Sequence, residues 1–156
     1  MSDRSTSHAT FVIKRSYDAP RARVWRAWAD PKQKLRWFGP RVLTKPKHEL
    51  DFRVDGIELM TVQAPDGALY SFVARYRDIV EGERLVHTYE IYRDEARISV
   101  SVATVTFEAV GTGTKLTMTE QGVFLDGLDT PAEREHGTRE LLDTLAAHLE
   151  SGGDGA

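Results

Sequence analysis

Residues 130–149 read TPAEREHGTRELLDTLAAHL, and this stretch decides the fold class. Thr130 and Glu133 have the spacing of a capping box, which satisfies free backbone amides at the start of a helix. Pro131 stands at the first helical position, where its missing N–H removes no hydrogen bond. Apolar or half-polar residues then recur at helical spacing, on one face over about five turns: Thr138, Leu141, Leu142, Leu145 and Leu149. The stretch therefore predicts a long C-terminal helix with one buried face.

The chain before this helix shows a succession of strand patterns separated by turn signals. Asp55-Gly56 and Asp66-Gly67 suit tight hairpins, because glycine accepts the positive φ that such turns require. Residues 81–83 and 111–113 supply two more glycine-containing turns. We expect strands at Leu50–Val54, Ile57–Ala64, Leu69–Val80, Arg84–Tyr92, Ile98–Val110 and Thr114–Gln121. Many hairpins in succession predict an antiparallel meander rather than a parallel sheet.

The N-terminal third adds one strand and two short helices. Residues 11–17 alternate Phe11, Ile13 and Tyr17 onto one face, which predicts a first strand. A helix is expected to start at Pro20, where Val24, Trp25 and Trp28 then recur at helical spacing.

A second helix is expected from Asp30-Pro31, with Asp30 as N-cap and Gln33 completing a capping box, and it should stop at Gly39-Pro40. The resulting order predicts an α+β fold. Its curved antiparallel sheet must wrap around the C-terminal helix to cover the apolar surfaces of both.

Composition indicates one soluble domain. The chain has 156 residues, of which 40% are hydrophobic and 29% charged, and its net charge is −3. That balance offers no electrostatic basis for binding nucleic acid. The chain has no cysteine, which excludes disulfides, thiolate catalysis and cysteine-ligated metals.

Both ends of the chain have the composition of tails. We expect residues 1–9, rich in Ser and Thr, and residues 151–156, SGGDGA, to be disordered around one domain at 10–150. No segment approaches the roughly 20 apolar residues that span a bilayer. The start lacks the apolar core of a signal peptide, and the expected location is the cytoplasm.

Several motifs in this order resemble the Aha-type activators of the Hsp-90 chaperone ATPase, a family of the START-like (SRPBCC) superfamily. The motifs are Asp18-Ala19-Pro20, Val24-Trp25 with Trp28, Asp30-Pro31, Trp37-Phe38-Gly39-Pro40, Pro65-Asp66-Gly67, Glu83–Val86, Gly113–Thr117 and Thr119–Gln121. Phe124–Gly127 followed by Arg134–Thr138 resembles a bacterial single-domain branch. The resemblance implies a helix-grip fold with a cavity between sheet and long helix. Relatives include lipid carriers, cyclases and chaperone activators.

The chain departs from the family pattern at two places. Arg53-Val54-Asp55-Gly56 stands where much of the family has a Gly-Gly pair after an arginine. Gly137-Thr138 stands where many members have Gly-Trp at the start of the last helix. A missing tryptophan beside the cavity should change its volume, so the ligand of a relative does not carry over.

The first half of the last helix is the expected site region. Gly137 interrupts the helix at a cost of about 1 kcal/mol relative to alanine, for close packing on the sheet or for approach of a ligand. Arg134 and Thr138 lie about one turn apart, either at the cavity or in solvent. For His136 and Arg139, solvent is the preferred interpretation.

Glu120 is in phase with Leu116 and Met118 in the last expected strand, which turns its carboxylate inward. It is expected to pair with Arg53 or Arg134, or else to bind a polar ligand group or act as a base. Arg15 and Arg53 are alternatives for an anionic group, with a structural ion pair preferred for each.

Aromatic and aliphatic side chains supply the expected cavity walls. The predicted ligand-binding set is Trp37, Phe38, Tyr70, Phe72, Tyr76, Glu120, Arg134, Gly137, Thr138 and Leu141. The five histidines form no ligand-spaced pair, and no nucleotide or nucleophile motif occurs, so we expect no metal, cofactor or catalytic residue.

The leading hypothesis is a protein that binds a small lipophilic molecule, as a monomer or homodimer. One alternative is a protein–protein module acting on a chaperone ATPase. Another is a cyclase- or hydrolase-type enzyme that uses Glu120, His136 or Arg134, and this requires the three side chains to converge in one cavity.

Overall fold

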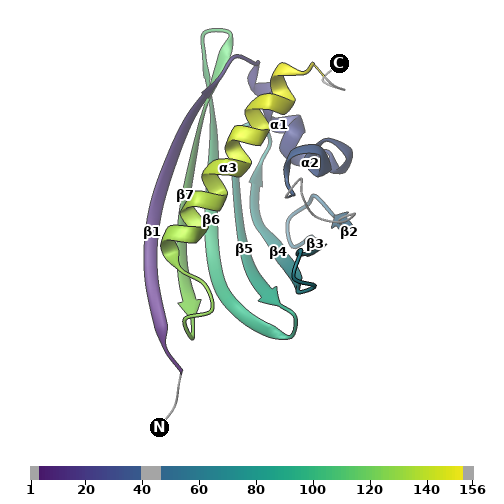
Figure 1. Ribbon diagram of the computed structural model, residues 1–156. Helices are drawn as coiled ribbons and strands as arrows, with labels where there is room; N and C mark the ends of the chain where they lie inside the picture. Colours follow the sequence, from purple (N-terminus) through teal and green to yellow (C-terminus); the bar gives the residue numbers. More distant parts are fainter. Residues whose placement is uncertain (1–3, 40–46, 153–156) are drawn as a thin grey trace.

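The computed structural model describes residues 4–39 and 47–152. Within these residues the chain forms one seven-stranded sheet and three helices (Figure 1). In chain order the elements are β1 Thr6–Tyr17, α1 Arg21–Ala29, α2 Pro31–Trp37, β2 Lys47–Leu50, β3 Ile57–Gln63, β4 Leu69–Val80, β5 Arg84–Arg93, β6 Ala96–Val110, β7 Gly113–Leu125 and α3 Pro131–Glu150.

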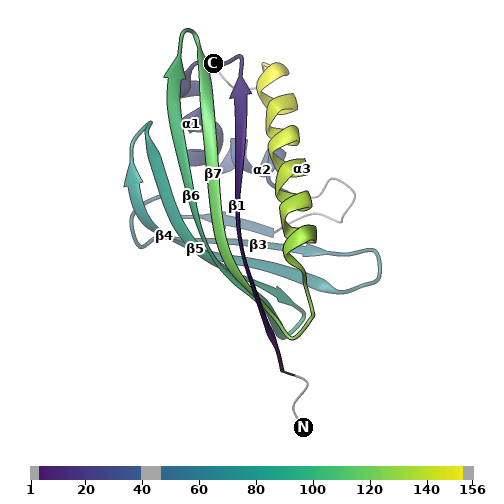
Figure 2. The same ribbon diagram turned by 90° about the vertical axis from the view of Figure 1, so that its left-hand side faces the viewer.

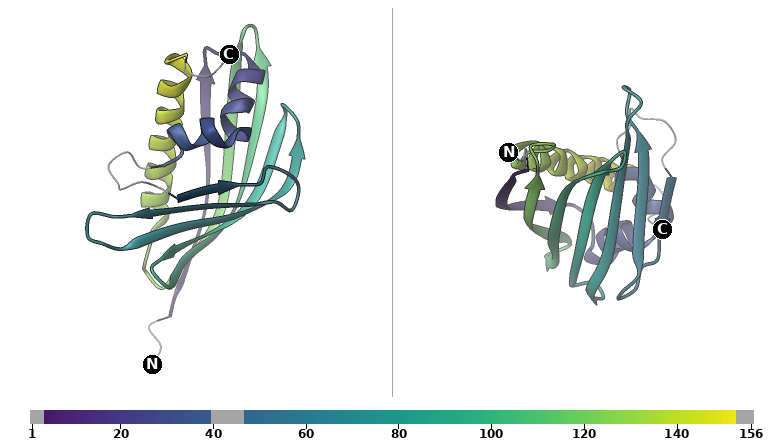
Figure 3. Two further views of the ribbon diagram at one scale, coloured as in Figure 1. Left: turned by 90° about the vertical axis from the view of Figure 1, so that its right-hand side faces the viewer. Right: turned by 90° about the horizontal axis from the view of Figure 1, so that it is seen from below.

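The sheet is antiparallel, with strand order β1-β7-β6-β5-β4-β3-β2. Its last six members form the predicted meander, and β1 pairs with β7 along its whole length, from Thr6↔Leu125 to Tyr17↔Thr114. Seen from below, the sheet curves around the helices (Figure 3). This arrangement confirms the predicted α+β helix-grip fold, in which the sheet wraps around the long C-terminal helix.

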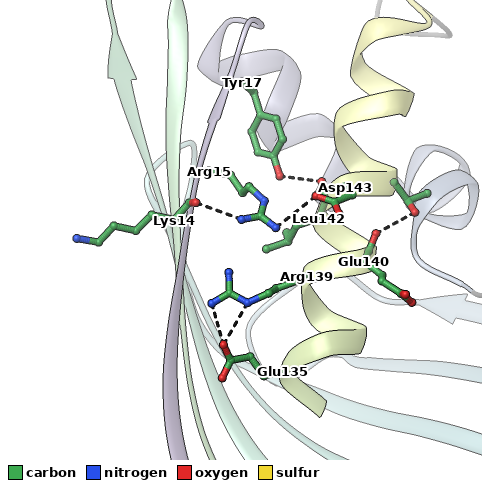
Figure 4. A network of polar contacts seen from close by, with 9 residues as sticks. Lys14, Arg15, Tyr17, Glu135, Arg139, Glu140, Leu142 and Asp143 are labelled. Atoms are coloured by element: carbon green, nitrogen blue, oxygen red, sulfur yellow. Dashed lines mark hydrogen bonds and ion pairs between the residues drawn. The ribbon is translucent and has the colours of Figure 1, made fainter. Parts of the chain in front are cut away.

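The C-terminal half of α3 anchors the helix to the sheet. The Thr130 hydroxyl accepts a hydrogen bond from the Glu133 amide, which is one half of the predicted capping box, whereas the Thr130 amide donates to Asp129 rather than to Glu133. Leu142 and Leu145 have no more than 1% of their surface exposed. The Tyr17 hydroxyl of β1 donates to the Leu142 carbonyl at 3.1 Å, beside an ion pair of Arg15 with the α3 residue Asp143 (Figure 4). Figure 2 shows α3 running next to β1.

The core between helices and sheet is aromatic. The Trp25 and Phe107 ring centroids lie 5.1 Å apart and those of Trp28 and Trp37 4.8 Å apart, both edge to face. Such pairs favour ordered packing beyond the area that they bury. Most of the aromatic side chains of the first two helices therefore lie in the hydrophobic core. None of the helices in the described part is both long and apolar enough to cross a membrane.

Part of the expected N-terminal tail belongs to the sheet. Residues 6–9 extend β1 and pair with residues 122–125 of β7, which is itself longer than predicted. These residues were not predicted as a strand because they lack alternating apolar side chains. The hydrogen bonds with β7 are made by the backbone and do not require such alternation. Residues 1–3 and 153–156 of the two expected tails lie outside the described residues.

The prediction of a strand at Leu50–Val54 was wrong. β2 ends at Leu50, and residues 51–56 form turns instead, with positive φ at Asp55 and not at Gly56. Gly56 is required for space, because a Cβ there would collide with the Asp51 carbonyl oxygen. The predicted hairpin was wrong because it required positive φ at Gly56. The structure needs glycine there because the backbone of Asp51 comes too close for a Cβ atom.

The first turn of α2 also differs from the prediction. The Asp30 side chain does cap the helix, but it accepts from the Lys32 amide at 2.9 Å. Gln33 is buried, and its side chain contacts Arg23 and His148 instead of returning to the helix start. The predicted capping box is therefore replaced by a simple Asp cap. α2 ends at Trp37, shortly before the expected stop at Gly39-Pro40. Pro40 itself lies outside the described residues.

Candidate functional site

A cavity of about 410 Å³ lies between α2, the first half of α3 and the inner face of the sheet. This volume falls within the range of small-molecule sites. Its walls are mainly apolar, with polar groups contributed by α2, β5, β7, α3 and the loop before α3. The lining residues are Trp28, Lys34, Trp37, Phe38, Gly39, Phe72, His87, Tyr89, Ile91, Met118, Glu120, Asp129, Glu133, Arg134, Gly137, Thr138, Glu140, Leu141, Leu142 and Thr144.

Eight of the ten residues proposed from the sequence line this cavity: Trp37, Phe38, Phe72, Glu120, Arg134, Gly137, Thr138 and Leu141. Tyr70 and Tyr76 do not. The Tyr70 hydroxyl accepts a hydrogen bond from the exposed Arg93, at the far end of β4. Tyr76 is fully buried and bonds Glu58 and Lys34 behind the cavity wall. Position along β4 thus decides which aromatic residues reach the cavity.

Gly137 leaves open space on the cavity side of α3. A Cβ at this position would meet nothing within 4 Å. Close packing on the sheet, one of the two explanations considered for this glycine, is therefore excluded. The position limits the size of the cavity, because any larger side chain would project into unoccupied volume.

Arg134 crosses from α3 to the sheet and holds the polar end of the cavity. Its guanidinium donates to Asp129 at 2.6 Å, to Ser99 at 2.8 Å and to the Tyr89 hydroxyl at 3.0 Å. The Glu120 carboxylate is farther away, at 3.8 Å. Arg134 therefore forms its closest ion pair with Asp129, and its positive charge compensates the negative charge of Glu120 only in part.

Glu120 is 1% exposed, and neither of its carboxylate oxygens has a partner in hydrogen-bonding geometry. Burial raises the pKa of this carboxyl group, and the nearby Tyr89 hydroxyl and Arg134 charge oppose the rise only in part. The expected alternative partner, Arg53, instead pairs with Asp51 on the surface. A buried acceptor without partners is unusual, because such groups normally find them.

Two cavity residues that carry a buried polar atom without a partner were not predicted as site residues from the sequence. The Nδ1 of His87 and the Nε1 of Trp28 are buried, and neither has a hydrogen-bond partner. His87 is in phase with Leu85 and Tyr89 on the buried face of β5, a signal that the sequence carried. Trp28 was predicted only as a core residue of α1.

A buried polar cluster, formed by Lys34, Glu58, Tyr76 and His48, supports the cavity wall behind α2. Lys34 Nζ contacts Glu58 Oε1 at 2.6 Å and the Tyr76 hydroxyl at 3.1 Å. His48 Nε2 contacts the other oxygen, Glu58 Oε2, at 2.7 Å. The phase of β3 carried the signal for Glu58, which shares its face with the buried Met60 and Val62.

The electrostatics of this cluster favour an ion pair. Burial alone would raise the pKa of Glu58, but the Lys34 charge and the bonds from His48, Lys34 and Tyr76 lower it to about 2. Burial lowers the pKa of Lys34, and Glu58 opposes that shift. Burial, with the charge of Lys34, also lowers the pKa of His87 from 6.5 to about 4.

These shifts predict a protein that loses stability in mild acid. His87 binds a proton more weakly when folded, so the unfolded state gains protons first and stability falls as pH drops from 6.5 towards about 4. We expect His87→Asn to flatten this part of the curve, measured by chemical unfolding at a series of pH values. His136→Asn, on the exposed face of α3, is the matched control. Parallel curves for wild type and His87→Asn would contradict the prediction.

The remaining candidates make surface or structural pairs. Arg15 bonds Asp143, Arg139 bonds Glu135 at 2.8 Å, and His136 lies 2.9 Å from Glu140 (Figure 4 shows the first two pairs). His136 has 75% of its side chain exposed, so it does not join Glu120 and Arg134 in the cavity. The three-residue acid–base set considered from the sequence is therefore not assembled. Among the described residues, no group of three or more His, Asp or Glu side chains could hold a metal.

Comparison with known proteins relates most of the chain to one family. The profile of the family described as Activator of Hsp90 ATPase homolog 1-like protein matches residues 18–150. No protein with a curated description matches significantly.

Solved structures extend the comparison. A putative uncharacterized protein from Rhizobium leguminosarum is 45% identical, with a TM-score of 0.91 over 95% of this chain and 98% of its own. A protein from Rhizobium loti is 38% identical, with a TM-score of 0.86 over 92% and 99%. One from Chromobacterium violaceum is 30% identical, with a TM-score of 0.75 over 88% and 94%.

Proposed function

The chain belongs to the family of Activator of Hsp90 ATPase homolog 1-like proteins, and we propose that it binds a small lipophilic molecule in the cavity between α3 and the sheet. The cavity has the size, the apolar walls and the few convergent polar groups that are typical of ligand sites. Membership of the family supports the fold, whereas the case for binding rests on the chemistry of the cavity.

One observation carries this proposal. Among the described residues, five buried side-chain atoms lack a hydrogen-bond partner, and four of them belong to residues that line the cavity: Trp28 Nε1, His87 Nδ1 and both carboxylate oxygens of Glu120. Each such group costs about 1–3 kcal/mol when it is left unsatisfied. Their concentration at one hollow is what a site for a polar-headed ligand requires, since the ligand would supply the missing bonds.

The rest of the cavity suits an apolar body. Phe38 and Phe72 stack edge to face with ring centroids 5.0 Å apart, and Phe72 continues to Tyr89 at 4.9 Å. Ile91, Met118 and Leu141 complete the wall. A flat aromatic or branched aliphatic group of a ligand would therefore be surrounded by rings, with its polar head towards β7.

Naphthylethanol is a suitable first probe, because its fused rings match these walls and its hydroxyl carries no charge. We expect it to raise the thermal midpoint of the wild-type protein, as a molecule that binds only the folded state must do. Gly137→Phe should weaken binding by about tenfold or more, since a filled site loses several apolar contacts. Gly137→Ala is the matched control and should bind while gaining helix stability of about 1 kcal/mol.

Native mass spectrometry of the purified protein supplies an independent readout, namely the mass of any retained small molecule. The proposal would be overturned by two results together: no shift with naphthylethanol up to its solubility, and no retained mass. Equal binding by wild type and Gly137→Phe, with both variants folded by circular dichroism, would place the probe elsewhere and also count against the cavity.

A further inference from the structure

Resting on the proposed function, we infer that the ligand is a lipophilic amine whose protonated nitrogen lies against Glu120. The inference concerns the polar end of the cavity, where β7, α3 and the loop between them meet. Three properties of that end support it: the balance of charge, the type of hydrogen-bonding group left without a partner, and the position of the apolar walls.

The first property is a shortage of positive charge. Two cations and four carboxylates line the cavity among the described residues: Lys34 and Arg134 against Glu120, Asp129, Glu133 and Glu140. Lys34 is 2.6 Å from Glu58 behind the wall, and Arg134 is 2.6 Å from Asp129. Both cations are thus engaged by other carboxylates. Glu120, with Arg134 only at 3.8 Å, is the buried carboxylate that a ligand cation would compensate.

The second property is hydrogen-bonding type. Burial raises the pKa of Glu120, and a ligand cation beside it would lower that pKa and favour the ionised form. An ionised carboxylate only accepts hydrogen bonds, and an ammonium group only donates them. Both oxygens of Glu120 are buried without a partner in hydrogen-bonding geometry. A protonated amine would satisfy them with charge-assisted bonds, which are stronger than neutral ones. A ligand carboxylate would instead bring a like charge to this end, with Arg134 already bonded to three other groups.

The third property is the position of the apolar walls relative to Glu120. His87 of β5 and Glu120 of β7 are both in register with Ala103 of β6, and the lowered pKa of His87 keeps its ring neutral at physiological pH. It therefore adds no positive charge that would repel an amine. The Phe72 and Tyr89 ring centroids lie 6.5 Å and 5.8 Å from the imidazole, and the Tyr89 hydroxyl reaches Arg134, the neighbour of Glu120, at 3.0 Å. An apolar body on these rings would place its head group near the carboxylate.

Three probes with one common body test the inference: naphthylethylamine, naphthylethanol and naphthylacetic acid. We expect the amine to bind about tenfold or more tightly than the alcohol, because a hydrogen bond to a charged group is the stronger one. The acid should bind more weakly than the alcohol. Dissociation constants from isothermal calorimetry at neutral pH provide the ranking.

Glu120→Gln keeps the shape of the side chain and removes its charge, and it should reduce the amine-to-alcohol ratio to about one. Glu108→Gln is the matched control, because Glu108 is exposed on β6 and does not line the cavity, and the change should be about twofold or less. If Glu120→Gln does not fold, the wild-type ranking alone decides. Binding of the alcohol without a preference for the amine overturns the inference and leaves the proposed function standing. Failure of all three probes counts against both.

Discussion

Lys34→Met is expected to lower the free energy of unfolding by about 3–5 kcal/mol, a large part of the stability of an ordinary domain. Lys34 and Glu58 are both essentially unexposed, and their charged atoms lie 2.6 Å apart. Methionine preserves much of the volume of the lysine side chain. It leaves the Glu58 carboxylate buried without its cation, and the two remaining hydrogen bonds from His48 and Tyr76 do not supply a full opposite charge. Chemical unfolding at neutral pH measures the loss.

A surface ion pair of the same length provides the control. Arg84 and Asp78 also lie 2.6 Å apart, but their side chains are 50% and 41% exposed. Arg84→Met should therefore cost less than about 1 kcal/mol. Adding Glu58→Gln to Lys34→Met should recover part of the loss, because it removes the isolated charge. If Lys34→Met costs no more than Arg84→Met, the buried cluster does not contribute to stability in the way proposed.

Leu145→Ala is expected to cost about 2–5 kcal/mol, the range for removing a large aliphatic side chain from a packed core. Leu145 has no exposed surface and belongs to the core shared by α1, the sheet and the C-terminal half of α3. The lost methyl groups leave a hollow that the neighbouring strands fill only partly. Thermal and chemical unfolding provide the measurement.

Leu128→Ala serves as the comparison, since Leu128 is 50% exposed in the loop before α3 and should change stability little. The contrast with Gly137→Ala is also informative. That variant adds a methyl group to the same helix and should stabilise it, because the helix gains propensity and nothing collides. A neutral effect of Leu145→Ala would show that the second half of α3 does not anchor the helix.

Local sequence patterns were sufficient to predict most of the helices and strands. The Thr130 N-cap and the leucine stripe of α3 were correct because a helix start and an amphipathic face are both short-range features. The strand bounds of β4 were predicted exactly, since turn residues limit it at both ends. The failure at residues 51–56 has the opposite origin. There the backbone conformation depends on contacts with Tyr76 of β4, which no local pattern contains.

The candidate site shows the same division. Strand phase and helix position predicted that Glu120 and Arg134 lie near one another. The sequence did not predict that Arg134 lies closer to Asp129 than to Glu120, because this depends on distances in the folded chain. Lys34 was missed because it lies between Lys32 and Arg36 in a segment that resembles a solvated helix face. Only its position one turn before Phe38 indicated that it would face inward.

The pairing of β1 with β7 has a consequence for how the chain folds. β1 is synthesised before the other strands of the described sheet, yet its partner residues lie at positions 114–125, so the two strands are far apart in the sequence. Long-range pairing of this kind slows folding, because a large loop must close before the contact contributes. During synthesis β1 has no partner strand until β7 has left the ribosome. We therefore expect its completion of the sheet to coincide with docking of α3, late and cooperatively, rather than from the N-terminus onward.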